Sequence, residues 1–369
     1  MRIAVLGAGS IGCLVAAKLV EDGHDVLVHA RGEHGAVLAV SGLQITGLWD
    51  YSVEPERWTV SLDEAGIHPS LEKSFDQAII TSKAKDTNKL CEVAIKLTDG
   101  PVLSLQNGLG NQEILRSHVF ENSAVGVTTN AVKRIAPGQI EWVGEGSLTV
   151  GGPKGEVFTD TLQSLSAEYS QDVSAIIWNK LLINVAINPL AAICGVLNGE
   201  LRFEPLLSQS ESTMLEAANI ARLLGVKISE DFVLIQNLHS VLDSTAENEC
   251  SMLADVKAGR ETEIEVLCGQ VVARGEKLGI PTPLNSMLLS QIKSLRRDLY
   301  SNAILCFQFY LVHLLLCELP LKLGFSILLI HETVYFFSRS SLPHLITNST
   351  FFLLFQVYQN YVQFLRHQS

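Results

Sequence analysis

The pattern of apolar and polar positions divides this chain of 369 residues into regions of different character. In the first region, short apolar runs alternate with helical patterns at Cys13–Glu21 and around Asp86–Leu97. Apolar runs of about four to eight residues between turn signals are typical of buried strands. The expected strands are Arg2–Leu6, Val26–Ala30, Gln77–Thr81, Val102–Leu105, Ala124–Thr128 and Ser147–Val150. The alternation predicts an α/β Rossmann-type dinucleotide-binding domain over residues 1–167.

From about residue 168 the strands give way to long helical periodicities. Helices are expected at about 172–194, 205–225, 229–246, 261–279 and 284–298. This pattern predicts an all-α C-terminal domain over residues 168–300.

Residues 301–369 form a third region, an atypical hydrophobic tail of Phe, Leu, Ile, Ser and Tyr with few charges. Its longest apolar run, Ser301 to Cys317, is at the lower length limit of a transmembrane helix. Three interpretations compete: a membrane-associated segment, a partner-binding extension, or a non-native C-terminus from alternative splicing or gene-model error. We favour the third, because the tail lacks clear amphipathic order and matches nothing in the preceding domains.

One apolar helix carries three polar residues four positions apart, Lys180, Asn184 and Asn188. At 100° per residue they fall within about 80° of one another, on one stripe. The other positions are mostly apolar, so the helix is expected to be buried nearly all round. A buried lysine needs partners or its pKa falls, and either condition suits proton transfer. The alternative is a surface helix with a chance polar stripe, and Pro189 predicts that the stripe bends away at Asn188.

A glycine-rich turn follows the first predicted strand and opens the first helix. Its residues are Gly7, Ala8, Gly9, Ser10, Ile11 and Gly12, in the Gly-x-Gly-x-x-Gly spacing. Between a strand and a helix, this spacing allows a tight turn, close backbone approach to a pyrophosphate, and a helix N-terminus facing the anion. The second strand ends in Arg31 rather than a carboxylate, which favours NADP through its 2′-phosphate. The alternative for Arg31 is a surface arginine in a turn.

Other polar residues follow predicted strands or join the later helices. Lys83 and Asn107 lie just beyond strand ends, where ligands of doubly wound sheets bind, although Asn107-Gly108 is also an ordinary turn dipeptide. Asn248 and Ser251 join two helices and are also plausible helix caps. Periodicity does not choose between the glutamates at 261, 263 and 265, since acidic residues are expected in a first helical turn.

Composition narrows the functional class. The net charge is −12 without a basic run, so nucleic acid is not expected as a partner. The seven scattered cysteines predict reduced thiols. The first strand leaves no room for a cleavable targeting signal, so the expected location is cytoplasmic. No residue constellation suggests a metal.

Several motifs in order give residues 1 to about 299 a resemblance to the ketopantoate reductase (2-dehydropantoate 2-reductase) family. The glycine motif Val5 to Gly12 is shared by many dehydrogenases. More specific motifs are Thr81-Ser82-Lys83-Ala84, Gln106 to Gly110, Trp178-Asn179-Lys180 through Asn188-Pro189-Leu190, Asn198-Gly199-Glu200-Leu201, Ser251-Met252-Leu253-Ala254-Asp255 and Thr262-Glu263-Ile264. The tail after Tyr300 has no counterpart in the family.

The resemblance implies reduction of ketopantoate by NADPH in pantothenate and coenzyme A synthesis, with hydride added to the C2 carbonyl. It implies Lys180 as the general acid and Glu263 as the acidic residue near the nicotinamide ribose that keeps the lysine charged. The implied cofactor positions are Gly7 to Gly12, Arg31, Lys83, Asn107, Ala131 and Glu263. The implied substrate positions are Asn107, Lys180, Asn184, Asn188, Asn198, Asn248 and Ser251.

Two other functions remain open at this point. One is a related 2-oxo- or 3-hydroxyacid dehydrogenase, which would also combine a Rossmann domain with a helical domain. The other is a non-enzymatic NADP-sensing protein with a membrane-associated tail. The sequence leaves the choice between monomer and homodimer open, and the family includes both.

Overall fold

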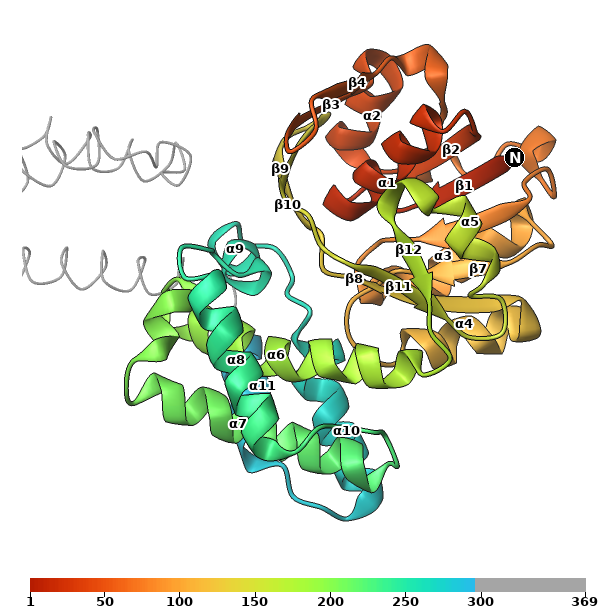
Figure 1. The fold of residues 1–369 in the computed structure, drawn as a ribbon. Helices are drawn as coiled ribbons and strands as arrows, with labels where there is room; N and C mark the ends of the chain where they lie inside the picture. Colours follow the sequence, from red (N-terminus) through yellow and green to blue (C-terminus); the bar gives the residue numbers. More distant parts are fainter. Residues whose placement is uncertain (296–369) are drawn as a thin grey trace, which may run out of the picture. The chain divides into compact units, whose positions relative to one another are not determined.

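The computed structural model describes residues 1–295 (Figure 1). The interpretations of the tail at residues 301–369 and the last residues of the predicted helix 284–298 lie outside the described residues.

An eight-stranded sheet organises the N-terminal domain. Its spatial order is β12-β11-β8-β7-β6-β1-β2-β5, and every neighbouring pair is parallel except β8 with β11. The strands are β1 Arg2–Leu6, β2 Asp25–Ala30, β5 Thr59–Leu62, β6 Gln77–Ile80, β7 Val102–Ser104, β8 Ser123–Thr128, β11 Leu148–Gly151 and β12 Ala167–Tyr169. The associated helices are α1 Ser10–Glu21, α2 Gly32–Ser41, α3 Thr87–Leu97, α4 Asn111–Val119 and α5 Val157–Thr161. The predicted Rossmann-type fold is confirmed.

The order of the strands explains where a ligand can bind. The chain runs from β1 to β2 and β5 on one side, then crosses to β6 on the other side of β1. Such a reversal creates a crevice outside the carboxyl ends of the two central strands. The glycine-rich turn follows β1 and Thr81 follows β6, so both lie at this crevice.

A second sheet in the same domain was not expected from the sequence. It has four strands in the order β4-β3-β10-β9, which span Tyr51–Val53, Leu43–Gly47, Gln139–Gly144 and Ala131–Ala136. These strands are of mixed burial, and every residue of β9 is partly or fully exposed. Strands with mixed exposure carry a weaker apolar signal than the buried parallel strands do.

The C-terminal domain is helical, as predicted. It contains α6 Val173–Cys194, α7 Leu206–Leu223, α8 Asp231–Ser244, α9 Ser251–Lys257, α10 Cys268–Leu278 and α11 Pro283–Ser294. Helix α6 packs against α7, α9 and α11, and its apolar residues belong to the core of this domain. Within residues 1–295, α6 is the helix that is long and apolar enough to cross a membrane, but its burial is equally that of a core helix.

One local prediction was wrong. The predicted helix 261–279 begins only at Cys268, after a 3₁₀ turn at Ile264–Val266. Pro189 does not end α6 near Asn188, because the helix continues to Cys194. Residues Val185 to Ala192 are all buried there, and their packing outweighs the cost of about 3 kcal/mol for an interior proline. The predicted domain boundary at residue 168 falls within β12, and α6 begins at Val173.

Candidate functional site

The glycine-rich turn is shaped by close contacts that exclude side chains at two of its three glycines. Gly7 has a φ of +111°, and a Cβ there would lie 2.6 Å from the backbone nitrogen of Ser82. A Cβ on Gly12 would lie 2.0 Å from the carbonyl oxygen of Gly7. In addition, Thr81 Oγ1 donates to the Gly7 carbonyl at 2.6 Å, which ties the turn to the end of β6.

Gly9 differs from the other two glycines because its missing side chain faces open space. The nearest heavy atom that a Cβ would meet is the Thr81 carbonyl oxygen, 4.0 Å away. Gly9 is the N-cap of α1, so the open space lies at the positive end of a helix with free N–H groups. Ala8 is buried behind the turn, while Ser10 and Ile11 begin α1 and are partly exposed. The turn therefore fits a dinucleotide pyrophosphate.

Lys180 and Asn107 come together across the two domains. The Lys180 ammonium projects from α6 and donates to Asn107 Oδ1 at 2.6 Å and to the Thr128 carbonyl oxygen at 2.8 Å. Asn107 Nδ2 in turn donates to Glu263 Oε2 at 3.1 Å. An ammonium only donates and a carboxylate only accepts, so this chain of contacts fixes the orientation of the Asn107 amide.

Burial governs the protonation of both charged groups. It lowers the pKa of Lys180 to about 8, against the opposing effect of the Glu263 charge. It also raises the pKa of Glu263, against the hydrogen bond from Asn107 and the charge of Lys83. A lysine with a pKa near neutrality can hold a proton and release it, as a general acid requires.

The loop that carries Asn107 is held by a network of buried polar groups. Gln106 is buried, and its Nε2 donates to Thr87 Oγ1 at 2.9 Å and to the Ser82 carbonyl oxygen at 3.2 Å. On the other side, the Leu109 N–H donates to the Val266 carbonyl oxygen at 3.0 Å. The Asn107 side chain is thus positioned by both domains.

The three glutamates that sequence periodicity left equivalent have different partners. Glu263 faces Asn107, whereas Glu261 pairs with Lys85 at 2.5 Å and Glu265 pairs with Lys293 at 2.5 Å. Of the three, Glu263 is the one that reaches Lys180 through a shared partner.

Two further expected substrate residues, Asn184 and Asn188, lie on α6. Asn184 lines the small cleft that also contains Lys180, Asn107 and Thr128. Asn188 is buried further along α6, and its carbonyl oxygen accepts from Cys250 Sγ at 3.7 Å.

The loop residues beyond α6 are arranged around Asn198. Its Nδ2 donates to Thr245 Oγ1 at 3.0 Å, while its buried Oδ1 has no partner within residues 1–295. Asn248 is exposed, and its carbonyl oxygen accepts from the Asn198 N–H at 3.1 Å. Ser251 is the exposed first residue of α9. Neither Asn248 nor Ser251 caps α9, because the N-cap is Cys250, whose Sγ accepts from the Leu253 N–H.

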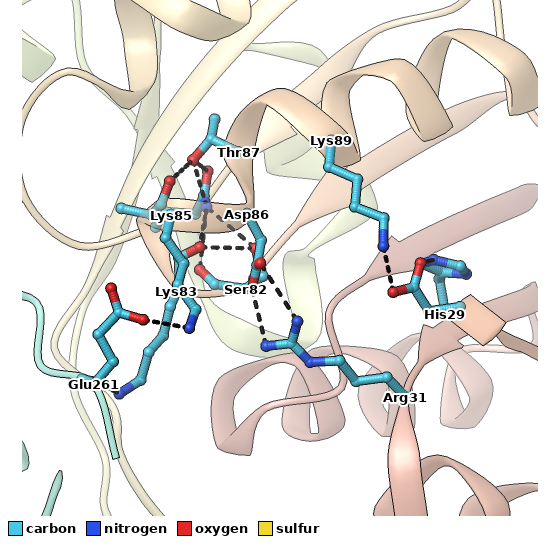
Figure 2. Close-up of polar contacts among 12 residues, drawn as sticks. His29, Arg31, Ser82, Lys83, Lys85, Asp86, Thr87, Lys89 and Glu261 are labelled. Atoms are coloured by element: carbon cyan, nitrogen blue, oxygen red, sulfur yellow. Dashed lines mark hydrogen bonds and ion pairs between the residues drawn. The ribbon is translucent and has the colours of Figure 1, made fainter. Parts of the chain in front are cut away.

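The other expected cofactor residues lie at the carboxyl edge of the sheet. Lys83 donates to Asp255 Oδ2 at 2.6 Å and to the Glu261 carbonyl oxygen at 2.7 Å, so it faces the helical domain in this structure. Arg31 is exposed and forms an ion pair with Asp86 (Figure 2). Ala131 begins β9, three residues after Thr128.

Sequence reasoning did not assign roles to three residues that shape the site, Thr128, Gln106 and Asp255. Thr128 contributes its backbone carbonyl, and because every residue has one, the residue type does not reveal this role. Gln106 and Asp255 both occur in the motifs that carry the family resemblance, and these motifs could have indicated that the two residues belong to the site. Asp255 is buried in α9 and bonds both Lys83 and Arg260.

Known proteins resemble the chain in both domains. The family model described as "Ketopantoate reductase PanE/ApbA" matches residues 3–155, and "Ketopantoate reductase PanE/ApbA C terminal" matches residues 172–296. The 2-dehydropantoate 2-reductase of Archaeoglobus fulgidus is 32% identical over 306 residues, which cover 81% of this chain and 99% of the relative. The protein of the same name from Pyrococcus horikoshii is 33% identical and covers 80% and 97%.

Solved structures resemble the chain over a similar share of its length. A PanE/ApbA family ketopantoate reductase from Ralstonia eutropha JMP134 has a TM-score of 0.72 at 29% identity, covering 80% of this chain and 98% of that one. D-mandelate dehydrogenase in a ternary structure with NADH and anilino(oxo)acetate has a TM-score of 0.75 at 25% identity, covering 81% and 99%. Both family models match, and together they span most of the sequence. The chain therefore belongs to the ketopantoate reductase family of oxidoreductases.

Proposed function

We propose that this protein reduces 2-dehydropantoate (ketopantoate) to pantoate with NADPH, a step in pantothenate and coenzyme A biosynthesis. The observation that carries the proposal is the partly buried Lys180 ammonium, which is fixed by Asn107 and the Thr128 carbonyl beside Asn184. The two family models and the curated relatives support the substrate class.

Lys180 would act as the proton donor to the substrate's C2 oxygen. An ammonium has three N–H donors. Two of them bond Asn107 and Thr128, which leaves the third for the substrate oxygen. NADPH, when bound, supplies the hydride that adds to C2. The oxygen then takes the proton from Lys180 Nζ, the lysine is left neutral, and solvent restores its proton. Charge stabilisation by such a donor in a closed site is worth about 3 kcal/mol.

Other residues would hold the reactants in place. Gly7 to Gly12 would bind the cofactor pyrophosphate, with Arg31, Lys83, Asn107 and Ala131 as further cofactor contacts. Glu263 would keep Lys180 charged and oriented through Asn107, with which it shares a hydrogen bond. Asn184, Asn188, Asn198, Asn248 and Ser251 would bind the substrate carboxylate and hydroxyl. Within residues 1–295 the Oδ1 of buried Asn198 has no hydrogen-bond partner, which supports a ligand contact there.

The likeness to D-mandelate dehydrogenase gives a second candidate, the reduction of another 2-oxo acid. We also propose that the protein is a cytoplasmic enzyme that acts on a small molecule as a monomer or homodimer. The non-enzymatic, NADP-sensing alternative does not explain why a lysine with a lowered pKa lies beside the amide side chains of Asn107 and Asn184.

A substrate panel tests the proposal. The purified protein is given NADPH with 2-dehydropantoate, benzoylformate, pyruvate or 2-oxoisovalerate, and the oxidation of NADPH is followed by its absorbance. We expect kcat/KM to be highest for 2-dehydropantoate by at least about tenfold, the discrimination that a polar contact to a substrate hydroxyl readily gives. Equal values across the panel would contradict the assignment, and a maximum with benzoylformate would favour the second candidate.

A further inference from the structure

The end of β2 presents an arginine that already has a carboxylate partner. Arg31 Nη2 donates to Asp86 Oδ2 at 3.0 Å, and Nη1 donates to Asp86 Oδ1 at 3.4 Å (Figure 2). The two residues come from different segments, since Arg31 follows β2 and Asp86 ends the 3₁₀ turn Ala84–Asp86 before α3. The Asp86 side chain is 18% exposed and that of Arg31 is 59% exposed, so the carboxylate is the better anchored partner.

A second carboxylate, that of Glu64, accepts a hydrogen bond from the backbone N–H of the next residue, Gly32. The backbone N–H of Gly32 donates to Glu64 Oε1 at 2.9 Å. The guanidinium of Arg31 and this N–H are adjacent donors at the position where Rossmann domains meet the adenosine ribose. Both donors therefore face a negative charge of the protein itself.

The lysines around this region are also neutralised by acidic partners. Lys85 pairs with Glu261 at 2.5 Å, and Lys89 pairs with Asp63 at 2.5 Å. Lys83 pairs with Asp255 at 2.6 Å. A site that selects a 2′-phosphate is expected to offer it positive charge that has no partner. Arg31 and these three lysines instead already have an acidic partner.

We propose that Asp86 is a specificity-determining residue. It lowers the affinity for the 2′-phosphate and so reduces the ratio of NADPH to NADH affinity that Arg31 would otherwise provide. This inference rests on the proposed function, in which Arg31 binds the 2′-phosphate. A 2′-phosphate must first displace Asp86 from Arg31, and it then lies close to a fixed negative charge. A ribose 2′-hydroxyl carries no charge and can donate a hydrogen bond to a carboxylate, as in NAD sites. Asp86 therefore disfavours NADPH and tolerates NADH.

Calorimetric titration of the cofactor-free protein tests this. NADPH and NADH are each titrated into the wild type and into Asp86→Asn, which keeps the size of the side chain and removes its charge. We expect Asp86→Asn to bind NADPH about three- to tenfold more tightly, the effect of one unit charge near a phosphate in water with some salt screening. The affinity for NADH should change less than about twofold. The gain should shrink at high salt.

Two further variants sharpen the test. Asp231→Asn removes an equivalent charge from the Arg222–Asp231 pair in the helical domain, which has a spacing of 2.7 Å, and should leave both affinities unchanged. Glu64→Gln should change the NADPH affinity in the same direction as Asp86→Asn. An unchanged ratio of NADPH to NADH affinity in Asp86→Asn would overturn the inference. Weaker NADPH binding would also overturn it, because Asp86 would then orient Arg31 for the phosphate.

The inference and the proposed function can fail separately. The wild-type affinities test whether NADPH is the preferred cofactor. The change in the NADPH-to-NADH ratio in Asp86→Asn tests the role of Asp86. A wild type that prefers NADH, with a variant that gains NADPH binding, would reject the proposed cofactor and support the role of Asp86.

Discussion

Replacing Lys180 by methionine removes the proposed proton donor and keeps the length and apolar body of the side chain. In the native protein Nζ bonds Asn107 Oδ1 at 2.6 Å and the Thr128 carbonyl at 2.8 Å, so the ammonium is held in one place. Loss of a general acid typically costs 10² to 10⁴ in rate. We expect kcat to fall by about 100-fold or more, which corresponds to about 3 kcal/mol of transition-state stabilisation. NADPH affinity should remain, because the glycine-rich turn is untouched.

The lowered pKa of Lys180 adds a pH dependence with a definite sign. Proton donation needs the ammonium, and burial sets its pKa at about 8. At saturating NADPH, kcat/KM for 2-dehydropantoate should therefore fall tenfold per pH unit above about pH 8. In Lys180→Met this fall in kcat/KM above about pH 8 should be absent.

Stability should change in the opposite direction over the same range. The pKa of Lys180 is about 8 in the folded protein against 10.5 for the ordinary side chain, so between these values the unfolded chain binds more protons. The free energy of unfolding should then rise with pH by about 3 kcal/mol across this window, relative to Lys180→Met. Urea unfolding of both proteins at pH 7 and pH 10 measures the difference.

Two results would refute this reasoning. One is a loss in kcat of less than tenfold in Lys180→Met, and the other is a kcat/KM that stays flat from pH 7 to pH 10. The exposed lysine Lys227 provides a matched control, since Lys227→Met makes the same chemical change on the surface and should leave both profiles unchanged.

Four further substitutions follow from the contacts described. Glu263→Gln removes the charge that raises the pKa of Lys180, so the fall in kcat/KM should move to lower pH; a shift to higher pH would reject this coupling. Arg31→Ala should weaken NADPH binding and leave NADH binding nearly unchanged, and an equal effect on both cofactors in a titration would exclude a 2′-phosphate contact. Gly9→Val should fold normally, as judged by its melting temperature, yet lose at least about tenfold in cofactor affinity, because its side chain would fill the open space at the helix N-terminus. In contrast, Gly12→Val should destabilise the fold by about 1–3 kcal/mol or more, because its Cβ would meet the Gly7 carbonyl; equal stability of the two variants would contradict that distinction.

The sequence predicted the parts of the fold whose signals are local. The buried strands Arg2–Leu6 and Gln77–Ile80 are nearly continuous apolar runs, and α6 shows a long apolar pattern. The segment Glu261–Val266 was predicted as helix but is not an α-helix, for a reason that lies in tertiary contacts. The Glu261 carbonyl accepts from Lys83, and the Val266 carbonyl accepts from Leu109. The N-terminal domain thus uses two carbonyls of this segment.

The candidate site was predictable to a different degree at each residue. The stripe of Lys180, Asn184 and Asn188 follows from helical spacing, and α6 extends through all three. The partners of Lys180 could not be read from residue types, because Thr128 contributes its backbone and Asn107 lies in a loop of the other domain. The Arg31–Asp86 pair joins positions 55 residues apart, so only the fold brings the two charges together.

The central claim is that this protein transfers a hydride to C2 of 2-dehydropantoate, and isotope transfer tests it most directly. The purified protein is incubated with 2-dehydropantoate and NADPH that carries deuterium at both C4 positions, and the product is analysed by mass spectrometry and NMR. We expect pantoate with one deuterium at C2 from the wild type, and at least 100-fold slower formation by Lys180→Met. Absence of labelled pantoate from the wild type, or equal rates in the two proteins, would contradict it.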